Sequence, residues 1–545
     1  MSSPLLQIDN LSVRLGARTL LHDLSLSLGP GRILGLVGES GSGKSMTALS
    51  VPGLLPEGAL RTGRVLLDGR DLAALDERAL TAVRGRDVGM IFQEPMTALN
   101  PLLGIGEQVA EAVRLHRRVS RRDALGVARA ALDRVGLPAA RFGLDRHPHE
   151  LSGGQRQRVA IAMAIALRPR LLIADEPTTA LDVTTQAQIL DLLRELVREE
   201  GCGLLLVTHD LAVVAELADE VAVLQSGRLV EQGAVAAVLG APQAACTQAL
   251  VRDSSIRVRP PRPQDAVATP LLEARGIVRE YRQGGAWFGR AQRLRAVDEA
   301  SLSVHVGENV GLVGESGCGK STLLRALLGL EAPQAGEVWV RGERFAGTAR
   351  QQQRLRRQIQ IVFQDPYGSF DPRWRVEQLV SEPFHLLERP PTPTERRARV
   401  EAMLARVGLA PADADRHAHE FSGGQRQRIA IARALITEPA IVVLDEALSA
   451  LDVTIRGQIL ALLAQLSDDL GVCYLFVSHD MSVVRAITDR VYVMAQGRLV
   501  ESGPTAEVFA APRHAVTRAL IDATPDLARA LAQRAQESAT ATTLA

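Results

Sequence analysis

Lysine is almost absent from this sequence. Only two of the 63 basic side chains are lysines, Lys44 and Lys320, and all the others are arginines. Cysteine is also scarce: the four cysteines lie far apart and form no C-x-x-C pair. This spacing argues against a zinc site, a disulfide framework or an iron–sulfur cluster, and it is compatible with a reducing compartment.

Long apolar runs and a surplus of charge are missing as well. No uninterrupted apolar run approaches the ~18 residues of a membrane-spanning helix, and the N-terminus lacks the pattern of a signal peptide. We therefore expect that the chain itself does not cross a membrane. The formal net charge of +1 gives no electrostatic reason to expect a nucleic-acid partner. With 545 residues, 46% of them hydrophobic, the chain is predicted to be globular and to form several domains.

Each lysine lies in a glycine-rich loop of the same pattern. Both loops fit G-x-x-x-x-G-K-[ST], in which backbone N–H groups surround phosphate oxygens and the hydroxyl can ligate Mg²⁺. A single match is also compatible with an ordinary glycine-rich turn. However, a compact ammonium fits between phosphates where a planar guanidinium does not, and lysine is kept only here. We expect two nucleotide sites, made by Gly38, Glu39, Ser40, Gly41, Ser42, Gly43, Lys44 and Ser45, and by Gly314, Glu315, Ser316, Gly317, Cys318, Gly319, Lys320, Ser321 and Thr322.

The two loops are part of a long internal repeat. The lysines are 276 residues apart, and every later pair of matching motifs is offset by 270 or 271 residues. This is the pattern of a duplicated domain. We place the first domain at 1–252, a proline- and arginine-rich linker at 253–269, the second domain at 270–522 and a flexible tail or frayed helix at 523–545.

Each half is predicted to be an α/β domain. Alternating apolar residues at 6–8 and 24–28 favour half-buried antiparallel strands. A continuous apolar run at 33–37 leads into the glycine-rich loop and then a helix, which is the context that this loop requires. Further apolar runs at 171–174 and 203–207, and their counterparts in the second half, indicate a parallel core sheet covered on both faces. Residues 102–150 are expected to be mainly helical.

Acidic pairs follow one predicted strand in each half. They are Asp175-Glu176 and Asp445-Glu446, at the carboxyl edge of the predicted sheet. There the aspartate can hold Mg²⁺ and the glutamate can polarise an attacking water. Ordinary acidic strand ends are the alternative interpretation. We expect the Mg²⁺ ligands to be Ser45, Gln93 and Asp175 in one site and Ser321, Gln364 and Asp445 in the other.

Histidine and glutamine recur at matched positions. His209 and His479 follow apolar strands in nearly identical contexts, and Gln93 and Gln364 each follow a phenylalanine. An isolated histidine at a strand end is usually structural. A matched pair favours residues that bind the γ-phosphate and position a water, so these four residues join Glu176 and Glu446 as candidate catalytic residues.

A third repeated segment precedes an Ala/Ile-rich helix. Ser152, Gly153, Gly154 and Gln155 return as Ser422, Gly423, Gly424 and Gln425. The backbone N–H groups at such a helix N-terminus suit an anion. A helix cap without a ligand is the alternative, but it does not explain why seven of the eight residues from Leu151 to Arg158 are identical in the second copy.

Together these motifs resemble the ATP-binding-cassette (ABC) ATPases over almost the whole chain outside linker and tail. The resemblance implies two ABC-type P-loop NTPase domains, each with a mainly parallel core sheet, an antiparallel β subdomain and a helical subdomain, and ATP and Mg²⁺ as cofactors. It identifies 38–45 and 314–321 as Walker A loops, 151–155 and 421–425 as signatures, and Asp182 and Asp452 as the ends of the D-loops. It also implies head-to-tail cassettes, here within one chain, so that Lys44 works with Ser422 and Lys320 with Ser152.

An aromatic residue before the Walker A loop commonly stacks on adenine in this family. Tyr281 occupies that place in the second half, whereas the first half has no aromatic residue before Lys44 and offers Leu15. We therefore expect weaker nucleotide binding at the Lys44 site.

Finer features around Gln93 and Gln364 resemble the peptide/nickel importer branch, especially its fused double-cassette subunits of the microcin C or oligopeptide type. This implies an ATPase at the cytoplasmic face of the membrane, bound to two membrane-spanning permease subunits and served by an extracytoplasmic solute-binding protein. Peptides are the expected solute, with nickel or another small solute as the alternative. The alternative is a soluble tandem-cassette ATPase acting on ribosomes or DNA. Such proteins usually have a long charged linker or zinc-binding cysteines, and this sequence has neither. A non-hydrolysing nucleotide scaffold fits poorly, because both halves keep every hydrolytic residue type.

Overall fold

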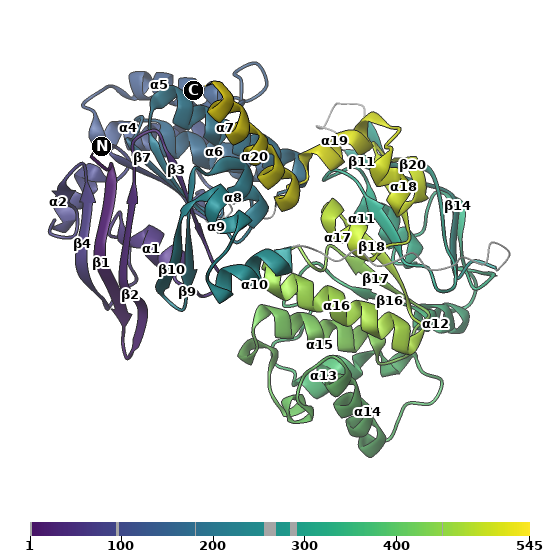
Figure 1. Ribbon diagram of the computed structural model, residues 1–545. Helices are drawn as coiled ribbons and strands as arrows, with labels where there is room; N and C mark the ends of the chain where they lie inside the picture. Colours follow the sequence, from purple (N-terminus) through teal and green to yellow (C-terminus); the bar gives the residue numbers. More distant parts are fainter. Residues whose placement is uncertain are drawn as a thin grey trace.

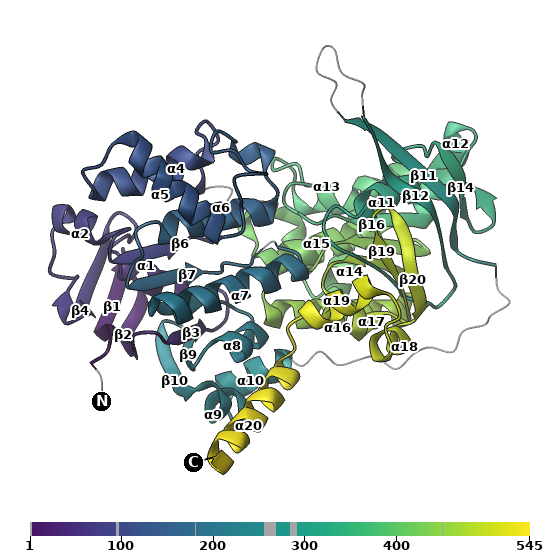
Figure 2. The ribbon, with the colours of Figure 1, turned by 90° about the horizontal axis from the view of Figure 1, so that it is seen from above.

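The computed structural model describes residues 3–93, 98–179, 181–254, 269–283, 292–449 and 451–544. Within these ranges, the chain forms two halves of the same architecture, which lie beside each other in Figures 1 and 2. Each half contains a four-stranded antiparallel sheet and a six-stranded sheet. Most of the expected linker, 255–268, lies outside the described residues, and α10 continues to Ser254.

The first half orders its antiparallel sheet β2-β1-β4-β5 and its core sheet β10-β9-β3-β8-β7-β6, in which only β10 is antiparallel. The strands are β1 (Leu6–Leu15), β2 (Arg18–Leu28), β3 (Ile33–Val37), β4 (Ala59–Leu67), β5 (Arg70–Asp71), β6 (Val88–Ile91), β7 (Leu171–Asp175), β8 (Gly203–Val207), β9 (Glu220–Gln225) and β10 (Arg228–Ala234). The helices are α1 (Lys44–Ser50), α2 (Glu77–Val83), α4 (Ile105–His116), α5 (Arg121–Arg134), η1 (Pro148–Glu150), α6 (Gly153–Ile165), α7 (Val183–Glu200), α8 (Leu211–Leu217), α9 (Val235–Gly240) and α10 (Ala245–Ser254).

The second half repeats this arrangement, with sheet orders β12-β11-β14-β15 and β16-β17-β18-β13-β19-β20. The strands are β11 (Leu272–Gln283), β12 (Gln292–Val304), β13 (Val310–Val313), β14 (Ala335–Val340), β15 (Glu343–Arg344), β16 (Ile359–Val362), β17 (Ile441–Asp445), β18 (Cys473–Ser478), β19 (Arg490–Ala495) and β20 (Arg498–Pro504). The helices are α11 (Lys320–Leu327), α12 (Ala349–Gln358), α13 (Val376–Ser381), η2 (Glu382–Leu386), α14 (Pro393–Arg406), η3 (Pro411–Asp415), η4 (Ala418–Glu420), α15 (Gly423–Leu435), α16 (Val453–Leu470), α17 (Met481–Ile487), α18 (Thr505–Ala510), α19 (Ala515–Ala523) and α20 (Leu527–Leu544).

The predicted fold class is confirmed. Every residue of β3, β7 and β8 is buried, as expected for parallel strands with helices on both faces. The alternating segments form the antiparallel pair β1–β2, in which Leu6, Ile8, Leu26 and Leu28 face the core. Residues 102–150 contain α4, α5 and η1, so the helical prediction for this segment is also correct.

The two halves contact each other through equivalent helices. α10 of the first half packs against α16 of the second, and α19 of the second half packs against α7 of the first. Val183, at the start of α7, is buried in one apolar cluster with Met481, Val484 and Leu520 of the second half. The halves are therefore joined by a pseudo-twofold pair of helix contacts.

Where a flexible tail or frayed helix is expected at 523–545, the structure has a helix packed against the first half. Residues 527–544 form α20, which crosses to the first half and lies against α8 and α9 in both views (Figures 1 and 2). Leu527 and Ala530 are buried in the core cluster of the first half. The Arg534 guanidinium donates to the carbonyl oxygens of Ala215 and Ala218, at the C-terminal end of α8. The segment has a short apolar face, which is buried only through its contacts with the first half.

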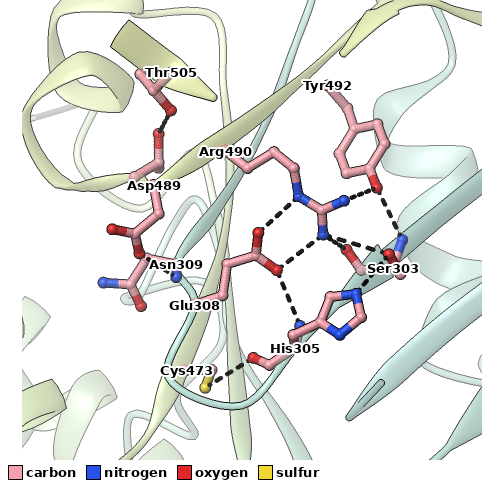
Figure 3. Close-up of polar contacts among 10 residues, drawn as sticks. Ser303, His305, Glu308, Asn309, Cys473, Asp489, Arg490, Tyr492 and Thr505 are labelled. Carbon is pink, nitrogen blue, oxygen red and sulfur yellow. Dashed lines mark hydrogen bonds and ion pairs between the residues drawn. The ribbon is translucent and has the colours of Figure 1, made fainter. Parts of the chain in front are cut away.

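A buried polar network distinguishes the second half (Figure 3). The Arg490 guanidinium donates to both carboxylate oxygens of Glu308, at 2.7 and 2.8 Å, and to the hydroxyl of Tyr492 at 2.9 Å. Glu308 is only 2% exposed. In the first half, the ion pair at the starts of the equivalent strands β3 and β9 is Arg32–Asp219, and the Arg32 side chain is 66% exposed. The starts of these strands are therefore joined by a buried ion pair in the second half and by an exposed ion pair in the first.

Candidate nucleotide-binding and hydrolysis sites

The two Walker A loops connect β3 to α1 and β13 to α11. Gly43 and Gly319 precede the helices with φ of 106° and 113°, a region that favours glycine. A Cβ atom on Gly319 would lie 2.2 Å from the carbonyl oxygen of Ala296. Only glycine therefore allows the backbone to turn here, which explains the fixed spacing before each lysine.

The two lysines lie inside their loops. Lys44 Nζ donates to the carbonyl oxygens of Gly38 and Glu39 at 2.8 and 2.9 Å, and Lys320 Nζ makes the same two bonds with its loop. Burial lowers the pKa of Lys44, while nearby carboxylates oppose this shift. One of these carboxylates is Asp452 of the second half. The D-loop of the second half therefore contributes to the electrostatic environment of the lysine of the first.

Two of the three expected Mg²⁺ ligands of the first half, Ser45 and Asp175, contact each other, whereas the Gln93 amide donates to Glu176. Ser45 Oγ donates to Asp175 Oδ1 at 3.2 Å. Burial raises the pKa of Asp175, and burial together with Glu446 raises that of Asp445 to about 6. Ser42 Oγ is buried without a hydrogen-bond partner, as expected of an atom that a phosphate oxygen would satisfy.

Hydroxyl and carboxylate oxygens are the ligands that Mg²⁺ prefers, and the ion usually takes few protein ligands alongside phosphates. Within the described ranges no group of three or more His, Cys, Asp or Glu residues gathers as a protein-only metal site. The donor set therefore fits Mg²⁺ bound together with a nucleotide. For the second half we find no hydrogen bond between Ser321 and Asp445, both of which the structure describes.

Glu176 lies at the centre of a small polar cluster. It receives hydrogen bonds from Gln93 at 2.8 Å and Thr179 at 2.9 Å, and His209 Nδ1 lies 3.1 Å from its Oε1 atom. Its φ of 47° is unusual for a residue other than glycine, and such strain clusters at active sites. Burial would raise its pKa, but the contacts with His209 and Thr179 lower it to about 2. The carboxylate is therefore ionised and held in one position.

The second half repeats this cluster with two changes, because His479 Nδ1 makes no hydrogen bond and Ser449 does not bond the carboxylate. Gln364 donates to Glu446 at 3.0 Å, and His479 Nδ1 lies 3.3 Å from its Oε1 atom. Glu446 also has a positive φ, 46°. Burial would raise its pKa, but His479 lowers it below the ordinary value. Ser449, however, donates to the backbone carbonyl of Glu446 and not to its carboxylate. The sequence prediction brought together the glutamate, glutamine and histidine of each half but missed Thr179.

The signature serines begin α6 and α15. Ser152 Oγ accepts from the N–H of Gln155, and the Gln155 side chain accepts from the N–H of Ser152; Ser422 and Gln425 form the same box. Both serines are exposed. A Cβ atom on Gly154 would lie 2.3 Å from the Thr185 side chain, so glycine is required for α6 to approach α7. The signature serines thus do cap their helices, and they also remain accessible to a ligand.

Asp182 and Asp452 cap α7 and α16 through the N–H groups of Thr185 and Ile455. Tyr281 lies at the end of β11, where its hydroxyl donates to Glu331 at 2.8 Å. The Arg279 guanidinium lies 5.1 Å from the centre of its ring. A stacked adenine would therefore have to share or displace Arg279.

Comparison with known proteins identifies the same family that the sequence motifs resemble. The family model described as ABC transporter matches residues 21–179 and 297–449. The glutathione import ATP-binding protein GsiA of Escherichia coli O6:H1 is 46% identical over 538 residues, covering 93% of this chain and 86% of GsiA. GsiA of Pectobacterium atrosepticum is 45% identical over 558 residues, covering 95% and 89%.

Among solved structures, the dimeric bacterial ABC transporter cassette MJ0796 covers 43% of this chain and 98% of its own, with 27% identity and a TM-score of 0.39. CbiO1 from Clostridium perfringens covers 44% and 91%, with 30% identity and a TM-score of 0.39. The family match in both halves, at the motifs described above, leads to one conclusion. The chain belongs to the ABC transporter family and is an ATP-binding ATPase with two cassettes in tandem.

Proposed function

We propose that this protein is the ATP-hydrolysing subunit of an importer and that its two cassettes share two composite ATP sites. One site combines the Lys44 loop with Ser422, and the other combines the Lys320 loop with Ser152. The observation that carries this proposal is the matched cluster around Glu176 and Glu446, present in both cassettes. The reciprocal packing of α10 on α16 and of α19 on α7 supports the pairing.

Hydrolysis follows from the positions of these side chains. In each site the lysine would neutralise outer phosphate charge, and the serine and aspartate would hold Mg²⁺, which would stabilise the developing negative charge. The glutamate, ionised and fixed by its neighbours, accepts a hydrogen bond from the attacking water and orients it. The histidine lies beside the glutamate, where it can also donate to the γ-phosphate. The hydrogen bonds from Gln93 and Thr179 fix the Glu176 carboxylate, so that it can orient the water.

The glutamate assignment is tested by substitution. Glu176→Gln and Glu446→Gln should each leave ATP binding intact and slow hydrolysis at that site by ~10²-fold or more, the scale of general-base and positioning help. Binding is measured by titration with a fluorescent ATP analogue and hydrolysis by phosphate release. Unchanged hydrolysis in the doubly substituted protein would refute the assignment.

The solute is proposed to be a short peptide. Relatives with 45–46% identity are named for glutathione import, and glutathione is itself a tripeptide. We propose that the chain acts at the cytoplasmic face of the membrane, bound to two permease subunits that receive solute from an extracytoplasmic binding protein. In agreement with a peripheral subunit, none of the described helices combines the length and hydrophobicity needed to span a bilayer.

The importer role is tested by purifying the protein from membranes with its partners and measuring uptake into proteoliposomes. Labelled glutathione, a labelled dipeptide and Ni²⁺ are compared, and the Glu176→Gln/Glu446→Gln protein serves as the control. ATP-dependent uptake of a peptide supports the proposal. Uptake of Ni²⁺ alone would overturn the peptide assignment, and recovery with ribosomes without any membrane subunit would overturn the importer role.

A further inference from the structure

Arg456 joins two functional segments of the second cassette. It lies in the first turn of α16, where its side chain is 17% exposed. Its guanidinium donates to Asp480 Oδ2 at 2.8 Å and to the carbonyl oxygen of Leu451 at 3.2 Å. Leu451 precedes the D-loop residue Asp452, and Asp480 follows His479. One side chain therefore fixes the D-loop relative to the segment that carries the catalytic histidine.

The Asp480 end of this link is itself rigid. Asp480 Oδ1 accepts from the N–H groups of Ser482 and Val483, so that the carboxylate caps α17 while its other oxygen receives Arg456. A planar guanidinium can hold two acceptors in fixed directions, which a lysine or an amide cannot do as well. A displacement of the His479 segment is therefore transmitted to the start of α16.

The first cassette lacks this link. Gln186 stands at the position of Arg456, in the first turn of α7, and Asp210 stands at the position of Asp480. Asp210 caps α8 in the same way. However, we find no hydrogen bond from the Gln186 side chain to Asp210 or to the D-loop, although the structure describes all these residues except Ala180. The tie between D-loop and histidine segment is therefore present in one cassette and absent from the other.

Arg456 lines a cavity between the two cassettes. This cavity, of about 570 Å³, is lined by Arg456, His479 and Asp480 of the second cassette and by their counterparts Gln186, His209 and Asp210 of the first. Thr178 and Thr179 of the first cassette line the same cavity, and Thr179 is the residue that donates to Glu176. The start of α16 and the segment that contacts Glu176 therefore border one shared cavity.

We propose that Arg456 is a positioning residue that makes hydrolysis at the Lys44 site depend on the state of the Lys320 site. The state is registered by His479, passes through Asp480 and Arg456, and sets the position of the Asp452 loop at the cavity that Thr178 and Thr179 also line. Because Gln186 provides no equivalent link, the dependence in the opposite direction is weaker. This inference rests on the composite sites proposed above. Binding energies are coupled reciprocally by thermodynamic necessity, so the one-way effect concerns the rate of hydrolysis.

The test uses the full chain in two backgrounds. In Glu446→Gln, phosphate release reports the Lys44 site, and in Glu176→Gln it reports the Lys320 site. Arg456→Gln gives the second cassette the residue of the first, and Gln186→Arg is the matched reverse exchange. ATP binding is followed independently in the Glu176→Gln/Glu446→Gln protein, together with its melting temperature.

We expect Arg456→Gln to slow phosphate release in the Glu446→Gln background by about fivefold or more, the lower end of usual couplings. In the double glutamine protein ATP binding and the melting temperature should stay unchanged. Gln186→Arg should not slow phosphate release in either background. Slowing only in the Glu176→Gln background would show that Arg456 serves its own cassette alone and would overturn the proposal. A lowered melting temperature with equal losses at both sites would reduce Arg456 to a structural role.

Failure of the underlying function gives a different result. If the wild-type protein hydrolyses no ATP, or if the glutamine backgrounds hydrolyse it at the wild-type rate, the composite ATPase sites are wrong before Arg456 is changed. If both backgrounds release phosphate too slowly to compare, Arg456→Gln and Gln186→Arg are compared in the protein that keeps both glutamates. A rate of phosphate release that Arg456→Gln leaves unchanged would then refute the coupling.

Discussion

Thr179 Oγ1 donates a hydrogen bond to Glu176 Oε2 at 2.9 Å, whereas its counterpart Ser449 donates to the backbone carbonyl of Glu446. The two candidate catalytic glutamates are therefore not held alike. Thr179 is one of the contacts that keep the pKa of Glu176 low, so its loss raises that pKa. Other contacts remain, and the carboxylate should stay ionised at neutral pH. What Thr179 mainly supplies is position.

Thr179→Ala should slow hydrolysis at the Lys44 site by about tenfold, because a hydrogen bond to a charged group contributes ~1.5–3 kcal/mol. Ser449→Ala should change the Lys320 site by less than about twofold, since no bond to its glutamate carboxylate is lost. Phosphate release in the Glu446→Gln and Glu176→Gln backgrounds, respectively, measures the two effects. Equal losses in both backgrounds would contradict the unequal support seen in the structure.

ATP should bind more tightly at the Lys320 site than at the Lys44 site. Base stacking on an aromatic ring contributes ~1–3 kcal/mol, and we take the low end because Leu15 keeps some apolar contact and Arg279 already lies over Tyr281. One kcal/mol corresponds to about fivefold in affinity. Titration of Lys44→Ala and Lys320→Ala variants isolates the sites, and Leu15→Tyr should narrow the difference. Equal affinities, or tighter binding at the Lys44 site, would contradict it.

Arg534→Ala should loosen α20 from the first cassette. The substitution removes two hydrogen bonds from a charged donor to the last carbonyls of α8, each worth ~1.5–3 kcal/mol. Amide hydrogen exchange in α20 should become at least about tenfold faster. Gln533→Ala, which changes an exposed neighbour, is the control and should have no effect. Unchanged exchange in Arg534→Ala would show that apolar contacts alone hold the helix.

Arg490→Met should destabilise the second cassette by ~3–5 kcal/mol, because it leaves the buried Glu308 carboxylate without its charged partner. Arg32→Met, which breaks the exposed pair of the first cassette, should cost no more than ~1 kcal/mol. All three tryptophans lie in the second half, so tryptophan fluorescence in urea reports its unfolding within the full chain. Similar midpoints for Arg490→Met and the wild type would contradict the network's role.

Local sequence patterns were sufficient to predict those parts of the fold whose conformation depends on neighbouring residues in the chain. The alternating residues of β1, the apolar run of β3 and the glycine-lysine loop each specify their own conformation through neighbours in the chain. The relation of Glu176 to Gln93 and His209 could be predicted because all three follow strands that end at the same edge of one sheet.

Features that depend on contacts between distant segments were not predictable in this way. α20 is stabilised by α8, more than 300 residues away along the chain, so its packing against the first half could not be predicted from local patterns. Thr179 and Ser449 are both hydroxyl residues at matched positions, and only their tertiary surroundings decide which atom each one bonds. The difference between Arg456 and Gln186 is visible in the sequence. Its structural consequence could be seen only when the structure placed Asp480 beside Arg456.

The most direct test of the account is Ser422→Arg, with Ser152→Arg as its matched control. If each ATP lies between the Walker A loop of one cassette and the signature of the other, Ser422→Arg should abolish phosphate release in the Glu446→Gln background, where the Lys44 site reports. It should leave most of the release in the Glu176→Gln background, and Ser152→Arg should do the reverse. Loss of release by Ser422→Arg only in the Glu176→Gln background would contradict the composite sites.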